Sequence, residues 1–233
     1  MRDTLLILLI LVFQNTFGQF GVINDKDGIV NVRKSPQISN NIIDTLHNGQ
    51  IVFYYEEPKG DWYGIDYEDG KYANSGYMHK SRLKFITEFE SVPLKNRAEN
   101  KVIFQKDSLK ITMTKVPFII NKNKLLYGEG NQSSFLKKIN DKEYWGSDGG
   151  IPTTQYGQIS IEWGEKRFAL PKESVEDLFE PNFEDKYTSV FFDFKSNTIY
   201  IIANNSDGAG GYSVLWIIEN GKFKRRYLSN AYA

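Results

Sequence analysis

Turn-forming residues divide the first part of the chain into segments that are too short for most helices. The turns are D-K-D-G (25–28), H-N-G (47–49), P-K-G-D (58–61) and E-D-G (68–70). Glycine, asparagine and aspartate tolerate the backbone angles of tight turns, so each turn can reverse the chain. The apolar stretches between the turns are 28–33, 42–46, 51–55, 62–67 and 76–78. Short strands at this spacing predict a small five-stranded β-barrel within residues 19–86.

A second β-rich domain is expected over residues 108–233. Apolar and polar residues alternate in 109–115 and 158–163, as in strands with one buried face, and 167–170 follows a short turn. The last part of the chain predicts an antiparallel meander with strands at 187–194, 198–204, 212–218 and 222–228. Residues 87–107 are polar and show no clear period, which favours a linker or an extended crossover.

One short amphipathic helix is predicted at residues 171–179. Val175, Leu178 and Phe179 stand at positions i, i+3 and i+4, with Pro171 at the start of the segment and Pro181 just past its end. The expected fold class is therefore mainly β. It comprises a small five-stranded barrel and a second, α+β domain that contains the meander and this helix.

The first eighteen residues have the features of an export signal. The apolar run from Leu5 to Phe13 is too short to span a bilayer, which needs roughly 20 apolar residues. Thr16 and Gly18 supply the small residues that precede a cleavage site before Gln19. We therefore expect residues 1–18 to be a signal peptide. The mature protein would be periplasmic or secreted, with no transmembrane segment after cleavage.

The composition argues against several kinds of function. The 233 residues include 29 Lys and Arg, 29 Asp and Glu, two His and no Cys. A neutral chain offers no excess positive charge for nucleic acid. Without Cys it has no disulfide, no thiolate metal site and no acylated cysteine of a lipoprotein. His47 and His79 both stand in predicted barrel turns, so the C-terminal domain lacks the commonest catalytic base. We expect no cofactor and no enzyme activity.

Four stretches at characteristic spacing give residues 25–85 a family resemblance. They are D-G-I-V-N-V-R-K-S-P (27–36), I-I-D-T-L-H-N-G-Q-I-V (42–52), G-D-W-Y-G-I (60–65) and S-G-Y-M-H-K-S-R-L-K (75–84). In this order they resemble a bacterial Src-homology-3-type domain. The resemblance implies a barrel that either binds cell-wall peptides or serves as a packing module. The insertion-like E-D-G-K-Y-A-N (68–74) departs from the family pattern.

The C-terminal region has a resemblance of its own, carried by Y-W-G-S-D-G-G-I-P (144–152) and D-G-A-G-G-Y-S-V-L-W-I-I (207–218). It is similar to an uncharacterised domain that follows such barrels in exported proteins of Bacteroidetes-type bacteria. This resemblance implies a common origin but no particular chemistry.

Aromatic residues of the barrel are the candidate ligand-binding groups. Side chains alternate across a strand, so if Ile65 faces the core then Trp62 faces outward. Four tyrosines could gather near it, and shallow aromatic grooves can bind extended peptides. The alternative is that Trp62 packs against the second domain or covers the barrel edge. The groove candidates are Tyr54, Tyr55, Trp62, Tyr72 and Tyr77.

Two Asp-Gly loops in the second domain invite a chemical interpretation. Asp148 and Asp207 could form a carboxylate pair, or bind Ca²⁺ together with Asn204 and Asn205. Neither loop has the spacing of a known calcium loop, and Asp-Gly sequences suit tight connections between strands. We therefore favour structural loops and keep both aspartates only as weak metal candidates.

Two sets of basic residues have a structural interpretation: Arg33 and the cluster at 222–226. Arg33 is expected to pair with an acid of the barrel and to hold the turn that follows it. In K-F-K-R-R (222–226), alternation places Lys222, Lys224 and Arg226 on one face of a strand. We interpret this cluster as a charged sheet edge that discourages aggregation.

We carry three hypotheses for function. The favoured one is an exported binding or scaffold protein whose barrel engages an extended peptide, with peptidoglycan among the candidate partners. The second is an inhibitor or immunity-type protein that acts by surface binding. The third is an envelope hydrolase that uses Asp148, Asp207 or Glu180, since carboxylates are the chemistry left to a domain without Cys or His.

Overall fold

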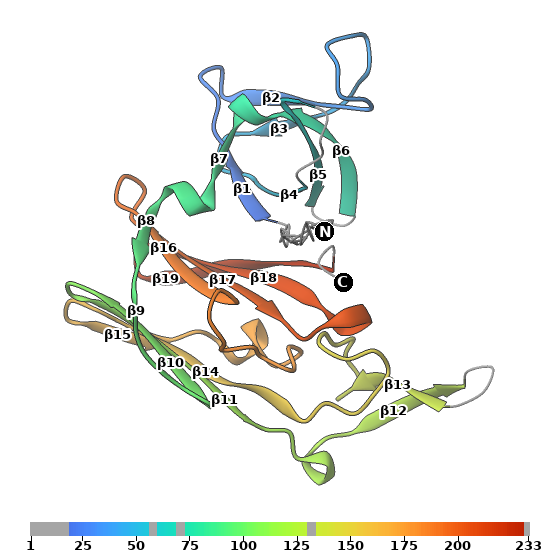
Figure 1. Ribbon diagram of the computed structural model, residues 1–233, viewed down its shortest axis with the longest axis vertical. Coiled ribbons are helices and arrows are strands. Elements are labelled where there is room, and N and C mark those ends of the chain that lie inside the picture. The colour runs from blue at the N-terminus through green and yellow to red at the C-terminus, as the bar shows by residue number, and fades with distance from the viewer. Residues whose placement is uncertain (1–18, 56–59, 69–72, 130–133, 231–233) are drawn as a thin grey trace, which may run out of the picture.

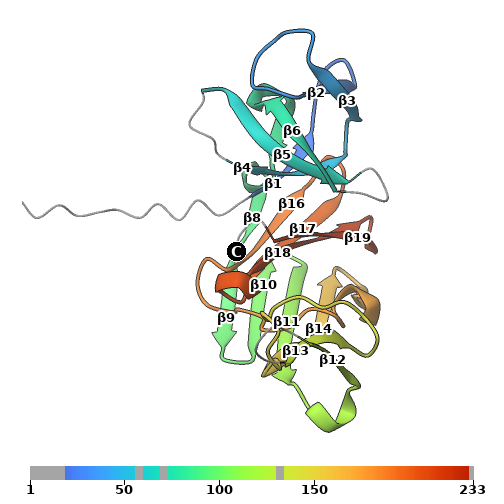
Figure 2. The same cartoon turned by 90° about the vertical axis from the view of Figure 1, so that its right-hand side faces the viewer.

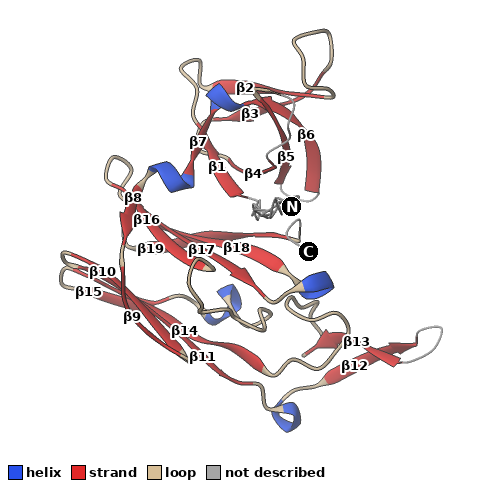
Figure 3. Ribbon diagram, viewed as in Figure 1, coloured by secondary structure: helices blue, strands red, loops and turns tan. Residues whose placement is uncertain are grey.

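The computed structural model describes residues 19–55, 60–68, 73–129 and 134–230. The predicted signal peptide lies outside these ranges. Strands make up most of the described chain, and its helices are single 3₁₀ turns (Figure 3). A barrel, a first open sheet and a second open sheet follow one another as three layers (Figures 1 and 2). The predicted mainly β fold class is confirmed.

The first layer is an antiparallel sheet of seven strands that curls around its own core (Figure 1). Its strand order is β3-β2-β6-β5-β4-β1-β7. The strands are β1 (Gln19–Ile23), β2 (Ile29–Arg33), β3 (Ile42–His47), β4 (Ile51–Tyr55), β5 (Trp62–Glu68), β6 (Ala73–His79) and β7 (Leu83–Phe85). The five strands expected from the sequence are β2 to β6. The sheet gains β1 and β7, which pair with each other and join the two ends of the domain.

Alternation along the strands fills the barrel with apolar side chains. Val30 and Val32 of β2, Ile65 and Tyr67 of β5 and Met78 of β6 all belong to one buried cluster. A 3₁₀ turn at Lys80–Arg82 connects β6 to β7. The residues between the inward-facing ones point out of the barrel, and some of them contact the next layer.

The C-terminal region contains two five-stranded antiparallel sheets packed face to face. Their orders are β19-β18-β17-β16-β8 and β15-β14-β11-β10-β9. The strands are β8 (Glu90–Val92), β9 (Leu94–Ala98), β10 (Lys101–Lys106), β11 (Leu109–Pro117), β14 (Thr154–Trp163), β15 (Lys166–Ala169), β16 (Thr188–Asp193), β17 (Thr198–Asn205), β18 (Tyr212–Glu219) and β19 (Lys222–Ser229). Strands β16 to β19 form the predicted meander.

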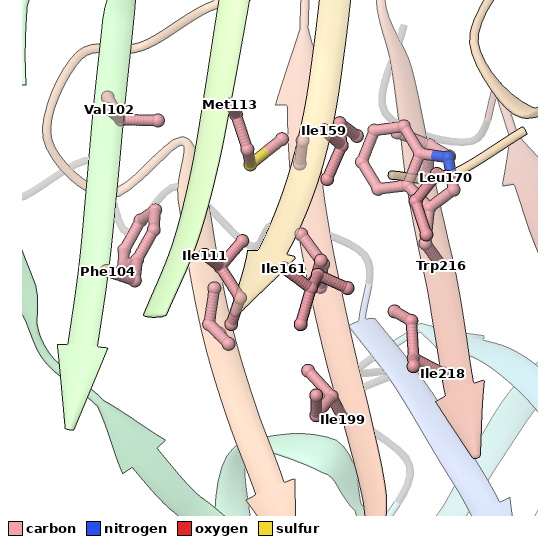
Figure 4. Close-up of a cluster of buried hydrophobic side chains, with 14 of the residues drawn as sticks. Val102, Phe104, Ile111, Met113, Ile159, Ile161, Leu170, Ile199, Trp216 and Ile218 are labelled. Carbon is pink, nitrogen blue, oxygen red and sulfur yellow. The ribbon is translucent and has the colours of Figure 1, made fainter. Parts of the chain in front are cut away.

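A large apolar core lies between these two sheets. Figure 4 shows Ile111 and Ile161 of one sheet beside Ile199 and Ile218 of the other. Trp216 is fully buried at this level, and its Nε1 donates a hydrogen bond to the carbonyl oxygen of Ser174 at 2.9 Å. The two sheets are thus held by burial of apolar surface, with the indole donor satisfied.

Residues 87–107 contain strands, so the expectation of a linker is wrong, whereas the alternative of an extended crossover agrees with the structure. β8 extends the meander sheet beside β16, whereas β9 and β10 belong to the opposite sheet. Only Pro93 separates β8 from β9, so the chain crosses between the two sheets there. The segment appears polar because all five residues of β9 are exposed on an edge strand.

The predicted helix at 171–179 is wrong. Only Lys172–Ser174 forms a 3₁₀ turn. A further turn at 175–177 follows it, and then Leu178 forms a bridge with Trp145 and Phe179 one with Gln155. Leu178 packs into the core between the sheets, whereas Phe179 enters a separate cluster. The apolar spacing therefore reflects burial at two different places rather than one helical face.

A two-stranded arm, β12 (Leu125–Glu129) and β13 (Ser134–Ile139), projects from the end of the sandwich (Figure 1). Leu136 and Ile139 anchor its base against Phe179. No helix in the described part of the chain is long and apolar enough to cross a membrane.

The barrel and the meander sheet meet through a second apolar cluster. Phe20, Ile51 and Phe53 of the barrel pack with residues of β17, β18 and β19. The sheet residues of this cluster are Tyr200, Leu215, Ile217 and Tyr227. β17 and β18 consequently have both faces covered, and nearly every residue in them is buried.

Candidate functional site

The outer face of β5 and β6 lies outside the contact between the barrel and the meander sheet. The contact with the meander sheet uses the outer faces of β1 and β4, and its cluster does not include Trp62, Gly64 or Tyr77. Because the pairing is antiparallel and in register, directly opposed residues of neighbouring strands share a face. The surface can therefore be built residue by residue from the register.

One row of this surface places a glycine between two tyrosines. Tyr55 of β4 is opposite Gly64 of β5, and Gly64 is opposite Tyr77 of β6. Gly64 has no side chain, so the sheet is hollowed between the two rings. The next row along the same face pairs Asp66 with Ser75.

These residues line a groove of about 400 Å³. Lys34 and Ile43, which lie after β2 and in β3, form its far side. The groove combines aromatic rings, a carboxylate, an ammonium group and a hydroxyl group, which suits a ligand with both apolar and polar parts.

A hydrogen bond fixes the tyrosine on the β4 side of the groove. The hydroxyl group of Tyr55 donates to Oδ2 of Asp66, and the Tyr55 ring meets Phe53 edge-on at 5.4 Å between centroids. Burial, followed by the hydrogen bond and charge of Asp66, raises the pKa of Tyr55 well above its usual value. Tyr55 therefore stays protonated and continues to donate to Asp66 at neutral pH.

Arg33 holds the loop beside the groove through hydrogen bonds to uncharged groups. Nη1 of Arg33 donates to the carbonyl oxygen of Ser39 at 2.7 Å and to Oδ1 of Asn41 at 2.9 Å. Nδ2 of Asn41 in turn donates to Oγ of Ser35 at 2.7 Å. The expectation that Arg33 holds this turn is correct, but its partners are a carbonyl and an amide instead of an acid.

Trp62 lies on the same face as Gly64 but at the end of the strands, outside the groove lining. Its half-buried ring meets the ring of His79 edge-on, with centroids 5.4 Å apart. Below it, Nζ of Lys80 lies 2.6 Å from Oδ1 of Asp61, and this pairing lowers the pKa of Asp61 and raises that of Lys80. The structure places Trp62 against His79, at the closing turn of the barrel.

The remaining two candidates do not line the groove. Tyr54 is a correction, because it points into the barrel: it is 2% exposed, packs against Tyr63 and Phe85, and its hydroxyl group donates to Gln19. Neighbouring residues on a strand face opposite ways, so Tyr54 and Tyr55 could not both be at the surface. Tyr72 lies outside the described residues.

The comparison with protein families identifies this part of the chain. Residues 28–84 match the bacterial SH3 domain. The match covers about a quarter of the 233 residues and contains β2 to β6 with the groove. No curated protein and no solved structure matches the chain.

The sequence approach missed Gly64 and Asp66 as parts of the groove in the SH3 domain. The alternation that turns Trp62 outward also turns out the second and fourth residues after it. The signal was therefore present in the alternation of W-Y-G-I-D-Y (62–67), although neither Gly64 nor Asp66 is aromatic.

Beyond the SH3 domain, the two Asp-Gly loops pack on each other. Oγ of Ser206 donates to the carbonyl oxygen of Gly146 at 2.9 Å, and a Cβ on Gly210 would lie 3.0 Å from the backbone of Ser147. Asp148 and Asp207 are both exposed. Within the described ranges, no three His, Cys, Asp or Glu side chains are grouped so that they could hold a metal ion.

The asparagines considered as calcium ligands are turned inward. Oδ1 of Asn205 accepts hydrogen bonds from the hydroxyl group of Tyr156 and the backbone N–H of Asn182, both at 3.0 Å. Oδ1 of Asn204 accepts one from Oγ of Ser213 at 2.6 Å. Their oxygens stabilise the base of the loop.

Glu180 and Asp207 both line a cleft of about 1140 Å³ at the end of the sandwich. Both carboxylate oxygens of Glu180 already accept hydrogen bonds. The donors are the hydroxyl groups of Thr153 and Thr154 and their backbone N–H groups. The residue has a left-handed backbone with φ of 50°. These contacts fix the connection between β14 and the segment after the 3₁₀ turn at Lys172–Ser174.

The basic cluster at 222–226 lies on an edge strand, β19, as expected. A β-bulge changes its faces, because Ile217 is opposite Arg225 whereas Ile218 is opposite Phe223. Arg226 therefore turns toward the sandwich and binds Asp177 through two hydrogen bonds of 2.6 and 2.5 Å. The prediction that Arg226 shares a face with Lys222 and Lys224 is wrong for this reason.

Proposed function

We propose that this protein is an exported binding protein whose SH3 domain takes up an extended peptide in the groove between Tyr55 and Tyr77. The observation that carries the proposal is the open groove. The meander sheet buries the outer faces of β1 and β4, yet the outer face of β5 and β6 keeps a hollow of about 400 Å³ lined by aromatic and charged groups.

The type of ligand follows from the shape and chemistry of this surface. A shallow trough with rings on both sides suits an extended backbone, which can place alternate side chains between the rings. Bacterial SH3 domains are binding modules, often for peptidoglycan. The peptides of a cell wall are thus the first ligands to test.

Export is part of the same proposal. The apolar run Leu5–Phe13 and the small residues Thr16 and Gly18 support a signal peptide at residues 1–18. We further propose that the C-terminal sandwich belongs with the uncharacterised domain of exported Bacteroidetes-type proteins. In this proposal the sandwich holds the SH3 domain in place and offers a second surface.

The proposal assigns the chain a binding role and no catalytic one. This is supported by the state of the carboxylates considered for hydrolysis: Glu180 is saturated with hydrogen bonds, and Asp148 does not line the cleft that Glu180 and Asp207 share. A general acid or base needs a free position near a reacting group.

The test is sedimentation of the purified protein with isolated peptidoglycan sacculi. Ser75→Arg should fill the groove from an exposed position and reduce the bound fraction at least about tenfold, as expected for loss of an interface centre. Ser134→Arg is the matched control, because Ser134 is an exposed strand residue on the β12–β13 arm. It should sediment like the unchanged protein.

Two results would refute the proposal. Either the unchanged protein stays in the supernatant, or both variants sediment equally well. If one stoichiometric protein from a culture supernatant is captured instead, an inhibitor or immunity-type role replaces the proposed one.

A further inference from the structure

We propose that the groove selects ligands that carry a positively charged group, an ammonium or guanidinium, held by Asp66 between the rings of Tyr55 and Tyr77. This inference rests on the proposed function, because it names the chemistry of the ligand in the same groove. It goes further in assigning one residue, Asp66, as the determinant of specificity.

The register places Asp66 at the floor of the groove. It is opposite Phe53 on β4 and Ser75 on β6, and it lies two residues beyond Gly64 on the same face of β5. Its side chain is half-buried. Glu68, two residues further along that face, is exposed and adds negative charge at the same end.

Asp66 lacks a cationic partner within the described part of the chain. None of the ion pairs found there includes it, whereas four other half-buried carboxylates of the described residues each have one: Glu162, Glu176, Asp177 and Glu219. Oδ2 accepts the hydrogen bond from Tyr55, whereas Oδ1 accepts none from the described residues. A half-buried carboxylate with one oxygen still open attracts a cation.

The two tyrosines are spaced to receive that cation. Neighbouring strands lie about 4.8 Å apart, so Tyr55 and Tyr77, separated by β5, are about 10 Å apart across the sheet. A group above Gly64 therefore lies between the backbones of the two tyrosines, and a cation there that comes within roughly 6 Å of the face of either ring is attracted to it. A side chain on Gly64 would occupy this place.

Lys34 does not neutralise Asp66. The strand order β2-β6-β5 puts the residue after β2 about two strand spacings, or about 10 Å, from the floor of the groove. Its side chain is exposed, and salt screens charges at that distance. Lys34 instead offers a partner for an acidic group elsewhere on the same ligand.

The experiment is a titration of the whole ¹⁵N-labelled protein, followed through its backbone amides by NMR. The probes are two capped peptides without terminal charges, acetyl-Ala-Ala-Lys-Ala-Ala-amide and acetyl-Ala-Ala-Gln-Ala-Ala-amide. We expect the lysine peptide to shift the amides of Gly64, Ser75 and Tyr77. It should bind at least about tenfold more tightly than the glutamine peptide, and added salt should reduce the difference.

Asp66→Asn is the decisive variant, because asparagine keeps an acceptor for the Tyr55 hydroxyl group but removes the charge. It should bind both peptides with equal affinity. Asp61→Asn is the matched control: Asp61 is an exposed aspartate of the same domain, paired with Lys80 outside the groove, and the variant should keep the preference for lysine.

Failure of this inference can be told apart from failure of the proposed function. Equal shifts of the groove amides by both peptides would overturn the selection for charge and leave peptide binding intact. A preference for lysine that survives in Asp66→Asn would overturn the assignment to Asp66. If neither peptide shifts the groove amides at about 10 mM, charge selection is refuted, and the sacculi then decide the proposed function alone.

Discussion

Leu215→Ala tests whether the SH3 domain and the sandwich behave as one folding unit. Leu215 lies on β18, is completely buried, and belongs to the cluster in which Phe20, Ile51 and Phe53 of the barrel meet the sheet. Truncation at this place removes apolar contacts that belong to both parts. It leaves the core between the two open sheets untouched.

The size of the effect can be worked out from the burial. Leucine loses three carbon atoms on conversion to alanine, and each buried carbon contributes about 0.8 kcal/mol, which gives about 2.4 kcal/mol. The cavity that remains adds to this, so the total cost is about 3–4 kcal/mol. With a urea dependence of about 2–3 kcal/mol per molar, the unfolding midpoint should fall by about 1–2 M. The control Leu126→Ala, at a side chain that is 44% exposed on the arm, should cost about 0.5 kcal/mol.

The assay is urea unfolding of protein labelled with 5-fluorotryptophan, monitored by ¹⁹F NMR. Of the four tryptophans, only Trp62 lies in the barrel, so its resonance, assigned with Trp62→Phe, reports on that part alone. In Leu215→Ala the Trp62 resonance should change at the same reduced urea concentration as the other three. An unchanged midpoint for Trp62 would refute the coupling. A loss no larger than that of Leu126→Ala would refute the estimate itself.

Three further predictions concern stability. Arg226→Met removes the two hydrogen bonds of Asp177 in an ion pair whose side chains are 20% and 16% exposed, so it should lower the free energy of unfolding in urea by about 2 kcal/mol. The control Arg97→Met affects a more exposed ion pair and should lower it by under about 0.5 kcal/mol. Burial raises the pKa of Tyr200 to about 12, so the contribution of Tyr200 to stability should be constant below about pH 10, where an unfolded tyrosine ionises, and should be lost between pH 10 and 12. Tyr200→Phe should make the fall in stability over this range smaller in a pH series of thermal melts. Glu180→Gly and Glu180→Ala lose the same hydrogen bonds, but at φ of 50° the glycine variant should be more stable by about 0.5–1 kcal/mol, and equal melting temperatures would contradict the backbone argument.

Local signals were sufficient for most strands of this fold. The meander strands β16 to β19 begin and end within about two residues of their predicted positions, because each is bounded by turn sequences such as E-N-G and K-S-N. In the segment 171–179, by contrast, the local signal predicted a helix that does not form. Its apolar spacing matches a helix, but Val175 and Leu178 are buried in one cluster and Phe179 in another, and only the three-dimensional context separates the two.

The sequence also contains a signal of the contact between the barrel and the sandwich. A strand with one solvated face alternates between apolar and polar residues, whereas I-Y-I-I-A (199–203) and V-L-W-I-I (214–218) are continuously apolar. Such runs indicate that both faces are covered. The sequence does not predict which part of the chain covers the second face of these strands. Phe20 and Phe53 of the barrel can be recognised as outward-facing only once the register of β1 and β4 is known.

The groove and the interface share a boundary, which links the scaffold to the site. Phe53 and Tyr55 are successive outward residues of β4: the first packs into the cluster shared with the meander sheet, and its ring contacts the second edge-on. Tyr55 then donates its hydrogen bond to Asp66, the residue that we assign to ligand charge. A side chain that is packed from behind and hydrogen-bonded in front loses little rotamer freedom when a ligand arrives, so the ordering cost of binding is reduced. In the proposed function the sandwich therefore has a physical role even without a residue in the groove, because it helps to fix the ring that forms one side of it.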